Sequence, residues 1–237
     1  MSDGQQLTVG VLGGMGPDAT VDLLQRIIDL TPARDDGDHI HVLVDNNPKV
    51  PSRMAAIIEG TGPSPAPAII RMAQGLEAQG ADFLVMPCNT AHHYHGEVSA
   101  AVDIPFLNLP ALVASYLSHQ SSTCQRVGVL GSSALQLIRL YESHLEAAGM
   151  QTCYPGAGSQ AGLMDLIRAV KGGSVNDALI ARLATAVLDL ENDEVDVLLV
   201  ACTELSVIAK DLQASLPIFD AAEILARAVV ERALNVD

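Results

Sequence analysis

Short apolar runs alternate with longer segments whose apolar residues recur at helical spacing. The runs have the length and composition of buried β-strands, and they lie at about residues 7–12, 39–44, 81–87, 104–108, 126–131, 151–154 and 195–201. Helical spacing occurs in the segments between them, at about residues 18–30, 67–79, 110–118, 135–148, 163–170, 175–190 and 221–234. This alternation predicts an α/β protein with mostly parallel sheets flanked by helices.

The first predicted helix has a clear apolar face. Within residues 18–30, we expect Val21, Leu24, Ile27 and Ile28 to face inward. A glycine-rich turn, residues 13–17, connects this helix to the preceding strand. The chain therefore begins with a strand, a glycine turn and a helix.

The pattern occurs twice. Residues 9–13 and 127–131 share the sequence Val-Gly-Val-Leu-Gly, an offset of 118 (127 minus 9). Two later apolar runs end in Cys88 and Cys202, an offset of 114 (202 minus 88). The sequence thus predicts two pseudo-symmetric lobes, residues 1–112 and 113–220, and we expect a C-terminal helix at 221–237 to complete the first.

Each of these two cysteines stands where a buried strand gives way to polar residues that open a helix. Cys88 is followed by Asn-Thr, and Cys202 by Thr-Glu. Because ligands of parallel sheets bind at the carboxyl ends of strands, and helix starts favour negative charge, these positions suit reactive thiolates. We interpret the two thiols as an acid/base pair. The alternative, buried inert thiols, is our expectation for Cys124 and Cys153.

Other polar features support weaker hypotheses. The glycine turn lacks the spacing of a dinucleotide or P-loop motif, so nucleotide binding is not favoured. His92, His93 and His95 point to different faces of a helix, which argues against a metal site. We expect His93 and His95 at the surface. Glu204 either polarises the Cys202 thiol or is a first-turn acid favoured by the helix dipole.

Charge and composition exclude several classes of function. The 237 residues include 28 acidic and 13 basic side chains, a net charge of −15 that would repel nucleic acid and anionic membranes. No apolar run reaches the roughly 20 residues of a membrane span, and the start lacks the features of a signal peptide. We therefore expect a cytoplasmic protein. Its four cysteines form no zinc pattern and, in reducing cytoplasm, no disulfide framework.

Five motifs in order resemble the cofactor-independent aspartate/glutamate racemase family, with the aspartate racemase branch nearer. They are Gly-Gly-Met-Gly-Pro at 13–17, Asn-Asn-Pro through Pro-Ser-Arg at 46–53, Met-Pro-Cys-Asn-Thr-Ala-His at 86–92, Val-Lys-Gly-Gly at 170–173 and Cys-Thr-Glu at 202–204. The resemblance implies two α/β lobes with the active site in the cleft between them. It also implies a homodimer.

The activity that the resemblance implies is interconversion of L- and D-aspartate, without pyridoxal phosphate, another cofactor or a metal. Cys88 and Cys202 would be the catalytic thiol and thiolate, exchanging roles with direction. Arg53 and Lys171 would hold the distal carboxylate of this small-molecule substrate. The substrate-binding residues implied are Met15, Asn47, Arg53, Asn89, Thr90, Lys171, Thr203 and Glu204.

The sequence also departs from the family pattern. Ser52 replaces a common aspartate, Ala201 a usual glycine, and Leu135 a common threonine. These differences leave other substrates open. The alternatives are a glutamate, broad-specificity amino-acid or hydantoin racemase, or a catalytically silent small-molecule-binding protein.

Overall fold

The chain divides into two compact units. The computed structural model describes residues 6–120, 124–209, 212 and 214–234. One unit comprises residues 1–112 and 222–237, and the other residues 113–221. The first five residues, to which the signal-peptide expectation applies, and residues 235–237 of the expected C-terminal helix lie outside the described ranges.

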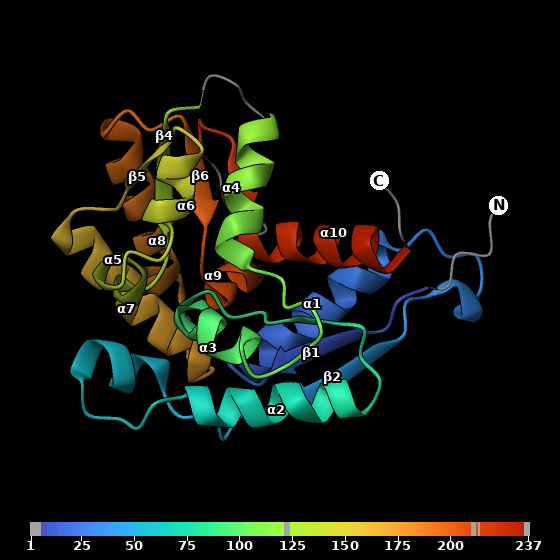
Figure 1. The fold of residues 1–237 in the computed structure, drawn as a ribbon. Coiled ribbons are helices and arrows are strands. Elements are labelled where there is room, and N and C mark those ends of the chain that lie inside the picture. Colours follow the sequence, from blue (N-terminus) through green and yellow to red (C-terminus); the bar gives the residue numbers. More distant parts are fainter. Residues whose placement is uncertain (1–5, 121–123, 210–211, 213, 235–237) are drawn as a thin grey trace. The chain divides into compact units, whose positions relative to one another are not determined.

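The first unit contains a parallel sheet in the order β2-β1-β3 (Figure 1). Its strands are β1 (Val9–Gly13), β2 (Val42–Asn46) and β3 (Phe83–Val85). The expected strand at 104–108 is reduced to one bridge between Leu84 and Phe106. Pro105 lacks an N–H group, and this limits the ladder that the segment can form.

The second unit repeats this topology with one more full strand. Its parallel sheet has the order β5-β4-β6-β7, with β4 (Arg126–Leu130), β5 (Gln151–Cys153), β6 (Val197–Val200) and β7 (Ile218–Asp220). The central strands β1 and β4 contain the repeated Val-Gly-Val-Leu segment, and the strands β3 and β6 beside them precede the two cysteines. Two parallel sheets flanked by helices confirm the predicted fold class.

A repeated aspartate ties the amino end of the central strand to its neighbour in each unit. Asp82 accepts a hydrogen bond from the Thr8 N–H at 2.7 Å. At the matching position, Asp196 accepts from the N–H groups of Gln125 and Arg126 at 2.7 and 2.8 Å. These bonds satisfy backbone donors at the amino ends of β1 and β4, and they join each central strand to the residue just before β3 or β6.

Helices cover both faces of the first sheet. In Figure 1, α2 (Ala66–Ala78) lies along one face, and α1 (Pro17–Leu30) and α10 (Ala221–Leu234) lie on the other. The Leu7 N–H donates to the Ala233 carbonyl at 2.9 Å. The Arg232 guanidinium lies 5.4 Å from the centre of the Phe83 ring. The C-terminal helix therefore packs within the first unit.

The predicted inward face of α1 was wrong in part. Val21 and Ile28 are 61% and 50% exposed. Ile27 is buried as predicted, together with Ala19, Thr20 and Leu23. Thr20 sets this rotation because its hydroxyl accepts from the Gly14 N–H at 2.9 Å and donates to the Gly16 carbonyl at 3.1 Å. Thr20, although polar, thus belongs to the buried face of α1.

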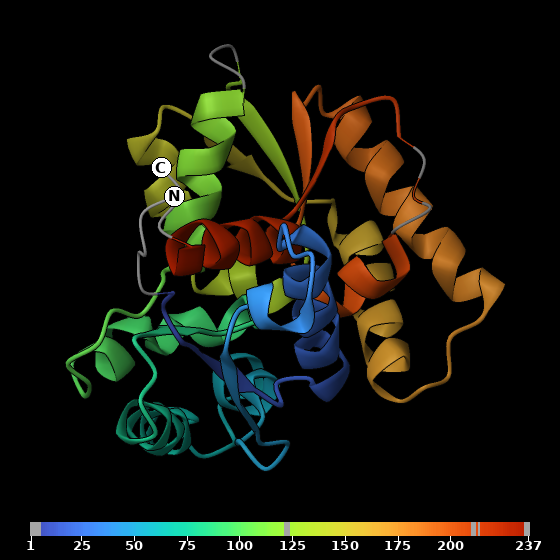
Figure 2. The same ribbon diagram turned by 90° about the vertical axis from the view of Figure 1, so that its right-hand side faces the viewer.

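Helices also cover both faces of the second sheet. Figure 2 shows α8 (Asp177–Asn192) and α4 (Leu109–Gln120) on opposite sides of its strands. The single helix expected at 135–148 is two helices, α5 (Ser133–Leu137) and α6 (Glu142–Ala147). Leu135 and Tyr141 are both fully buried. Because six residues rotate a helix by about 240°, one straight helix could not bury both on the same face.

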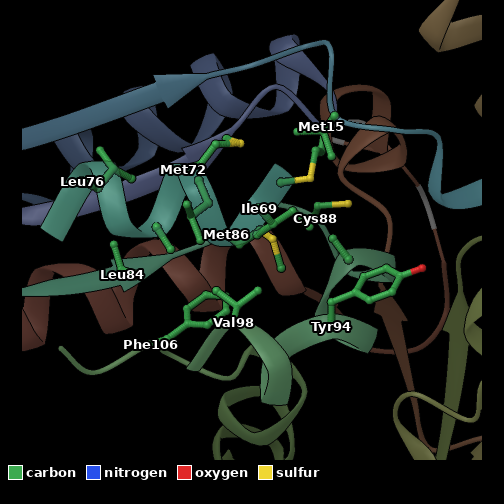
Figure 3. Packing of buried hydrophobic residues seen from close by; sticks show 14 of the residues in the cluster. Met15, Ile69, Met72, Leu76, Leu84, Met86, Cys88, Tyr94, Val98 and Phe106 are labelled. Carbon is green, nitrogen blue, oxygen red and sulfur yellow. The ribbon is translucent and has the colours of Figure 1, made fainter. Parts of the chain in front are cut away.

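An apolar cluster between the first sheet and α2 forms the core of the first unit (Figure 3). Leu84, Met86 and Cys88, in and just after β3, lie in this cluster with Ile69 and Leu76 of α2. Figure 3 shows Met15, Cys88 and Tyr94 at one end of the cluster. The same packing that stabilises the unit therefore holds Cys88 in place.

Two glycines of the first unit should respond oppositely to an added methyl group. A Cβ at Gly10 of β1 would lie 2.7 Å from Leu84 Cδ2, whereas one at Gly75 of α2 would meet nothing within 4 Å. We predict that Gly10→Ala lowers the free energy of unfolding by about 1–3 kcal/mol. Gly75→Ala should raise it by up to about 1 kcal/mol through helix propensity. Urea unfolding measures both, and equal effects would contradict this packing.

Candidate active site

Both candidate cysteines lie just beyond the carboxyl ends of equivalent strands. Cys88 follows β3, which ends at Val85, and Cys202 follows β6, which ends at Val200. Each cysteine is only 7% exposed. Cys202 is the N-cap residue of α9 (Thr203–Ile208). The helix expected after Cys88 is a 3₁₀ helix, η3 (Thr90–Tyr94), followed by the short α3 (His95–Ser99).

The backbone at Cys88 is held by its own turn and by a buried histidine. The Cys88 N–H donates to the Met86 carbonyl at 2.8 Å. His92 Nδ1 lies 2.9 Å from the Cys88 carbonyl, so this nitrogen is assigned as the protonated one. Burial lowers the pKa of His92 to about 4, and the bond to the Cys88 carbonyl opposes this effect. His92 is therefore a neutral support for Cys88 near neutral pH.

An aromatic stack holds His92. Its ring lies 5.8 Å from the Phe106 ring and 6.1 Å from the His95 ring, centre to centre. His95 is half-buried, stacks on Phe106 at 4.5 Å, and has Nε2 3.0 Å from the Phe106 carbonyl. The expectation that His95 is a surface residue was wrong, because its ring stacks on Phe106. Phe106 lies in the segment that takes the place of a fourth strand beside β3. His93 is exposed, as expected.

Arg53 joins the loops that follow β1 and β2. Its guanidinium donates to the carbonyls of Pro51 at 3.0 Å, Met15 at 3.2 Å and Val50 at 3.4 Å. The side chain is half-buried. These three bonds leave part of the five-donor guanidinium for other acceptors. Arg53 is therefore a backbone clamp that retains a positive charge beside Met15.

The glycine turn lies against the loop that follows β2, at Asn47. Gly14 has φ +86°, and a Cβ at this position would overlap the backbone of Asn47. The Asn47 side chain accepts from the Lys49 N–H at 3.0 Å and shapes its own loop. Gly14 therefore lets the backbone of the turn lie close to the Asn47 backbone. In the same unit, Asn89 is buried and Thr90 half-buried.

In the second unit, three predicted residues form a connected chain. The Cys202 thiol donates to Glu204 Oε2 at 3.1 Å. The other oxygen, Oε1, lies 3.3 Å from Lys171 Nζ. Lys171 is the last residue of α7 (Ala157–Lys171). Thr203, between the cysteine and the glutamate, is buried.

The electrostatic environment disfavours a Cys202 thiolate. Burial raises the pKa of the Cys202 thiol well above its ordinary value, and the Glu204 carboxylate raises it further. Lys171 opposes both effects. The simple expectation that a strand end and helix start lower the pKa of this cysteine is therefore wrong for Cys202, because burial and a carboxylate dominate.

Sequence reasoning missed Ser206 and Asp220, which support Cys202. The Ser206 hydroxyl lies 2.7 Å from Asp220 Oδ1, and the Ser206 N–H donates to the Cys202 carbonyl at 2.9 Å. Asp220 is the last residue of β7. It could have been found by the signal that singled out the cysteines, a polar residue at the end of an apolar strand.

The three departures from the family pattern have structural roles. The Ser52 hydroxyl accepts from the Ala55 N–H at 3.2 Å, at the start of the π-helical turn η2 (Ala55–Glu59). Leu135 is fully buried, and Ala201 is 1% exposed. A Cβ at Gly131 would clash with Leu135 and approach the Ala201 carbonyl. Leu135 thus fills the core.

Across the described part of the chain, no three histidine, cysteine or carboxylate side chains are grouped so as to hold a metal ion. The four cysteines are free thiols. Burial raises the pKa of both Cys124 and Cys153. Within the same described ranges, every helix is too short or too polar to cross a membrane.

The depressed pKa of His92 predicts a loss of stability in acid. An unfolded histidine titrates near 6.5, whereas His92 resists protonation down to about pH 4. The unfolded state therefore gains protons first as the pH falls through this window. We expect the free energy of unfolding to fall between pH 6.5 and 4 by about 3 kcal/mol more in wild type than in His92→Gln. Urea unfolding at several pH values measures this.

The exposed His93 provides the control for this prediction. His93→Gln should retain the steep acid dependence of the wild type, because its ring is not buried. If His92→Gln and wild type lose stability in parallel between pH 6.5 and 4, the buried neutral imidazole is refuted.

The arrangement matches known racemases in sequence and in structure. Residues 12–229 match the model of the Asp/Glu/Hydantoin racemase family. The broad specificity amino-acid racemase RacX of Bacillus subtilis is 28% identical over 226 residues, which cover 94% of this chain and 96% of RacX. The aspartate racemase of Picrophilus torridus superimposes with a TM-score of 0.84 at 32% identity, covering 96% of this chain and 94% of that one.

A more distant structure shares the fold. An aspartate racemase homologue from Pyrococcus horikoshii superimposes with a TM-score of 0.75 at 22% identity, covering 96% of this chain and 99% of that one. The family match spans residues 12–229, which include both cysteine motifs and strands β2 to β7. The chain therefore belongs to the Asp/Glu/hydantoin racemase family.

Proposed function

We propose that this protein is an amino-acid racemase that interconverts L- and D-aspartate by proton transfer between Cys88 and Cys202, without a cofactor. The observation that carries the proposal is the repeated placement of a buried cysteine beyond the carboxyl ends of β3 and β6. Membership of the family supports an amino-acid racemase. The proposal requires both thiols to reach one substrate from opposite sides.

Two thiols suit the chemistry of inversion. One thiolate removes the α-proton, and the thiol on the other face returns a proton, so that the configuration inverts. The α-carboxylate gains negative charge as the proton leaves. We propose that the side chains and backbone N–H groups of Asn89, Thr90 and Thr203 stabilise this charge, because these residues adjoin the two cysteines.

Aspartate is proposed as the substrate on two grounds. The aspartate racemase of Picrophilus torridus is 32% identical over nearly the whole chain. In an acidic protein, Arg53 and Lys171 are cations near the candidate residues, and either could bind the distal carboxylate of a dicarboxylic amino acid. The Met15 carbonyl accepts from Arg53, and Asn47 follows β2. Both residues would contact the same part of the substrate as Arg53.

A broad-specificity racemase is the second candidate. RacX of Bacillus subtilis matches 94% of this chain at 28% identity. In addition, both proposed cations already have partners: Arg53 binds backbone carbonyls and Lys171 binds Glu204. A substrate without a distal carboxylate would leave these contacts intact. This observation favours testing neutral amino acids beside aspartate.

The decisive experiment follows the α-proton by NMR. Wild type, Cys88→Ser and Cys202→Ser are incubated in deuterated buffer with reducing agent and each enantiomer of aspartate, and circular dichroism of the same samples records inversion. We expect each substitution to reduce racemisation by at least about 10²-fold, because each removes one acid/base group. Full activity of either variant would refute the two-thiol mechanism.

A panel of substrates separates the alternatives. Glutamate, several neutral amino acids and a 5-substituted hydantoin are tested under the same conditions. Inversion of many amino acids at similar rates would support the broad-specificity candidate instead of an aspartate racemase. Thermal stabilisation by aspartate with no turnover of any compound would indicate a binding protein.

Arg53 provides a test of dicarboxylate recognition. We expect Arg53→Ala to raise KM for aspartate at least about tenfold more than KM for a neutral amino acid, since a lost charge-assisted bond affects only the dicarboxylate. Arg53→Lys, which keeps the charge but not the fork of donors, should recover part of the affinity for aspartate. If KM for both substrates rises equally in Arg53→Ala, Arg53 is a backbone clamp only.

A further inference from the structure

A chain of contacts runs from Lys171 through Glu204 to Cys202. The internal repeat of the sequence does not require this chain. The Cys202 thiol points to one oxygen of Glu204 at 3.1 Å, and Lys171 Nζ lies 3.3 Å from the other. The Glu204 side chain is 11% exposed and the Lys171 side chain 40% exposed. The lysine side chain is therefore the more exposed of the two, and the carboxylate contacts both its ammonium group and the buried sulfur.

The two contacts define where the protons are. A carboxylate paired with an ammonium group is ionised, and an ionised carboxylate only accepts hydrogen bonds. The sulfur within hydrogen-bond distance of it must therefore carry its proton. A thiolate at this position would face the carboxylate with like charge.

From this geometry, we propose that Glu204 is a positioning residue that keeps Cys202 as the protonated, proton-donating thiol of the resting enzyme. Lys171 weakens this effect of Glu204, because its positive charge offsets the charge of the carboxylate. The inference rests on the proposed two-thiol racemisation and deepens it by assigning the resting role of each cysteine. Cys88 is then the base with which the resting enzyme begins.

The proton transfers balance without another reactant. The Cys88 thiolate takes the α-proton, so one C–H bond breaks and an S–H bond forms. Cys202 gives its proton to the opposite face of the α-carbon, so its S–H bond breaks and a new C–H bond forms. Cys202 is left as a thiolate beside Glu204, where the ammonium group of Lys171 offsets the repulsion. The enzyme returns to its resting form by exchanging protons with water.

The other charged and titratable groups near Cys202 do not supply this control. Tyr141 is fully buried close to both Asp220 and Cys202, and burial raises its pKa well above the ordinary value, so its hydroxyl stays neutral. Asp220 binds the Ser206 hydroxyl at 2.7 Å. Glu204 is the carboxylate in direct contact with the sulfur.

The test titrates Cys202 directly, in the full-length protein and without substrate. Protein labelled with ¹³C at the cysteine β-carbon is titrated by NMR from pH 6 to 10.5, and the Cys202 resonance is assigned with Cys202→Ser. We expect Glu204→Gln to lower the pKa of Cys202 by roughly one pH unit or more, because a carboxylate is removed. Lys171→Met should not lower it, so in that variant the resonance should stay at its thiol position throughout.

Matched control variants separate a local effect from a change in net charge. Glu146→Gln removes a charge from the ion pair with Arg139, and Arg168→Gln removes one from the ion pair with Asp165. Both pairs belong to the same unit as Cys202, and their side chains are at least half exposed. Both controls should leave the Cys202 titration unchanged. The inference is overturned if Glu204→Gln leaves or raises the pKa of Cys202, or if Glu204→Gln and Lys171→Met shift it in the same direction.

A failure of the inference on Glu204 can be distinguished from a failure of the proposed function. The titration needs no turnover, so it tests the Glu204 contact whether or not the protein inverts aspartate. Activity adds a readout that a merely structural role would not move: the pH at which kcat/KM falls on the alkaline side should shift with the Cys202 pKa in both variants.

Discussion

Parallel pairing around one buried central strand in each unit determines where the candidate chemistry lies. β1 pairs with β2 and β3, and β4 with β5 and β6, all in the same direction. Every strand of a sheet therefore ends at the same edge, and the polar residues that follow are brought together there. Close packing disfavours a side chain at Gly10, where a Cβ would lie 2.7 Å from Leu84 Cδ2, and leaves little room at Gly128. The cysteines are thus positioned by the sheets rather than by the loops that carry them.

The sequence was sufficient for the features that depend on burial and repetition. Apolar runs predicted β1 to β6 but not β7, and the repeat predicted two similar sheets with a cysteine after the matching strand of each. The sequence was insufficient where the contacts of a single side chain outweigh the pattern of apolar residues. The Thr20 hydroxyl bonds the glycine turn and rotates α1, so Val21 becomes exposed. Buried Leu135 and Tyr141 divide a helix that periodicity predicted as one.

The candidate site was predictable in its residue types but not in their partners. A sequence identifies Arg53 and Lys171 as scarce cations in an acidic chain, yet it does not show that one binds the Met15 carbonyl and the other Glu204. These partners matter to the proposed function because a substrate carboxylate bound there would have to share or displace them. Arg53 can share, since a guanidinium has five donors. Lys171 can share through the remaining N–H groups of its ammonium, but each anion that it binds reduces its influence on Glu204.

The two candidate cysteines follow equivalent strands but have different electrostatic surroundings. The Cys88 carbonyl is held by a neutral imidazole, and its side chain lies in an apolar cluster. Cys202 faces a carboxylate that is itself paired with an ammonium group. Enantiomers have equal free energies, so a racemase must accelerate both directions equally at equilibrium, but nothing requires its two acid/base groups to be alike. In the proposed mechanism, this difference would decide which protonation form accumulates between turnovers. A duplicated scaffold therefore places a thiol after the matching strand of each unit, while a carboxylate contacts only one of the two.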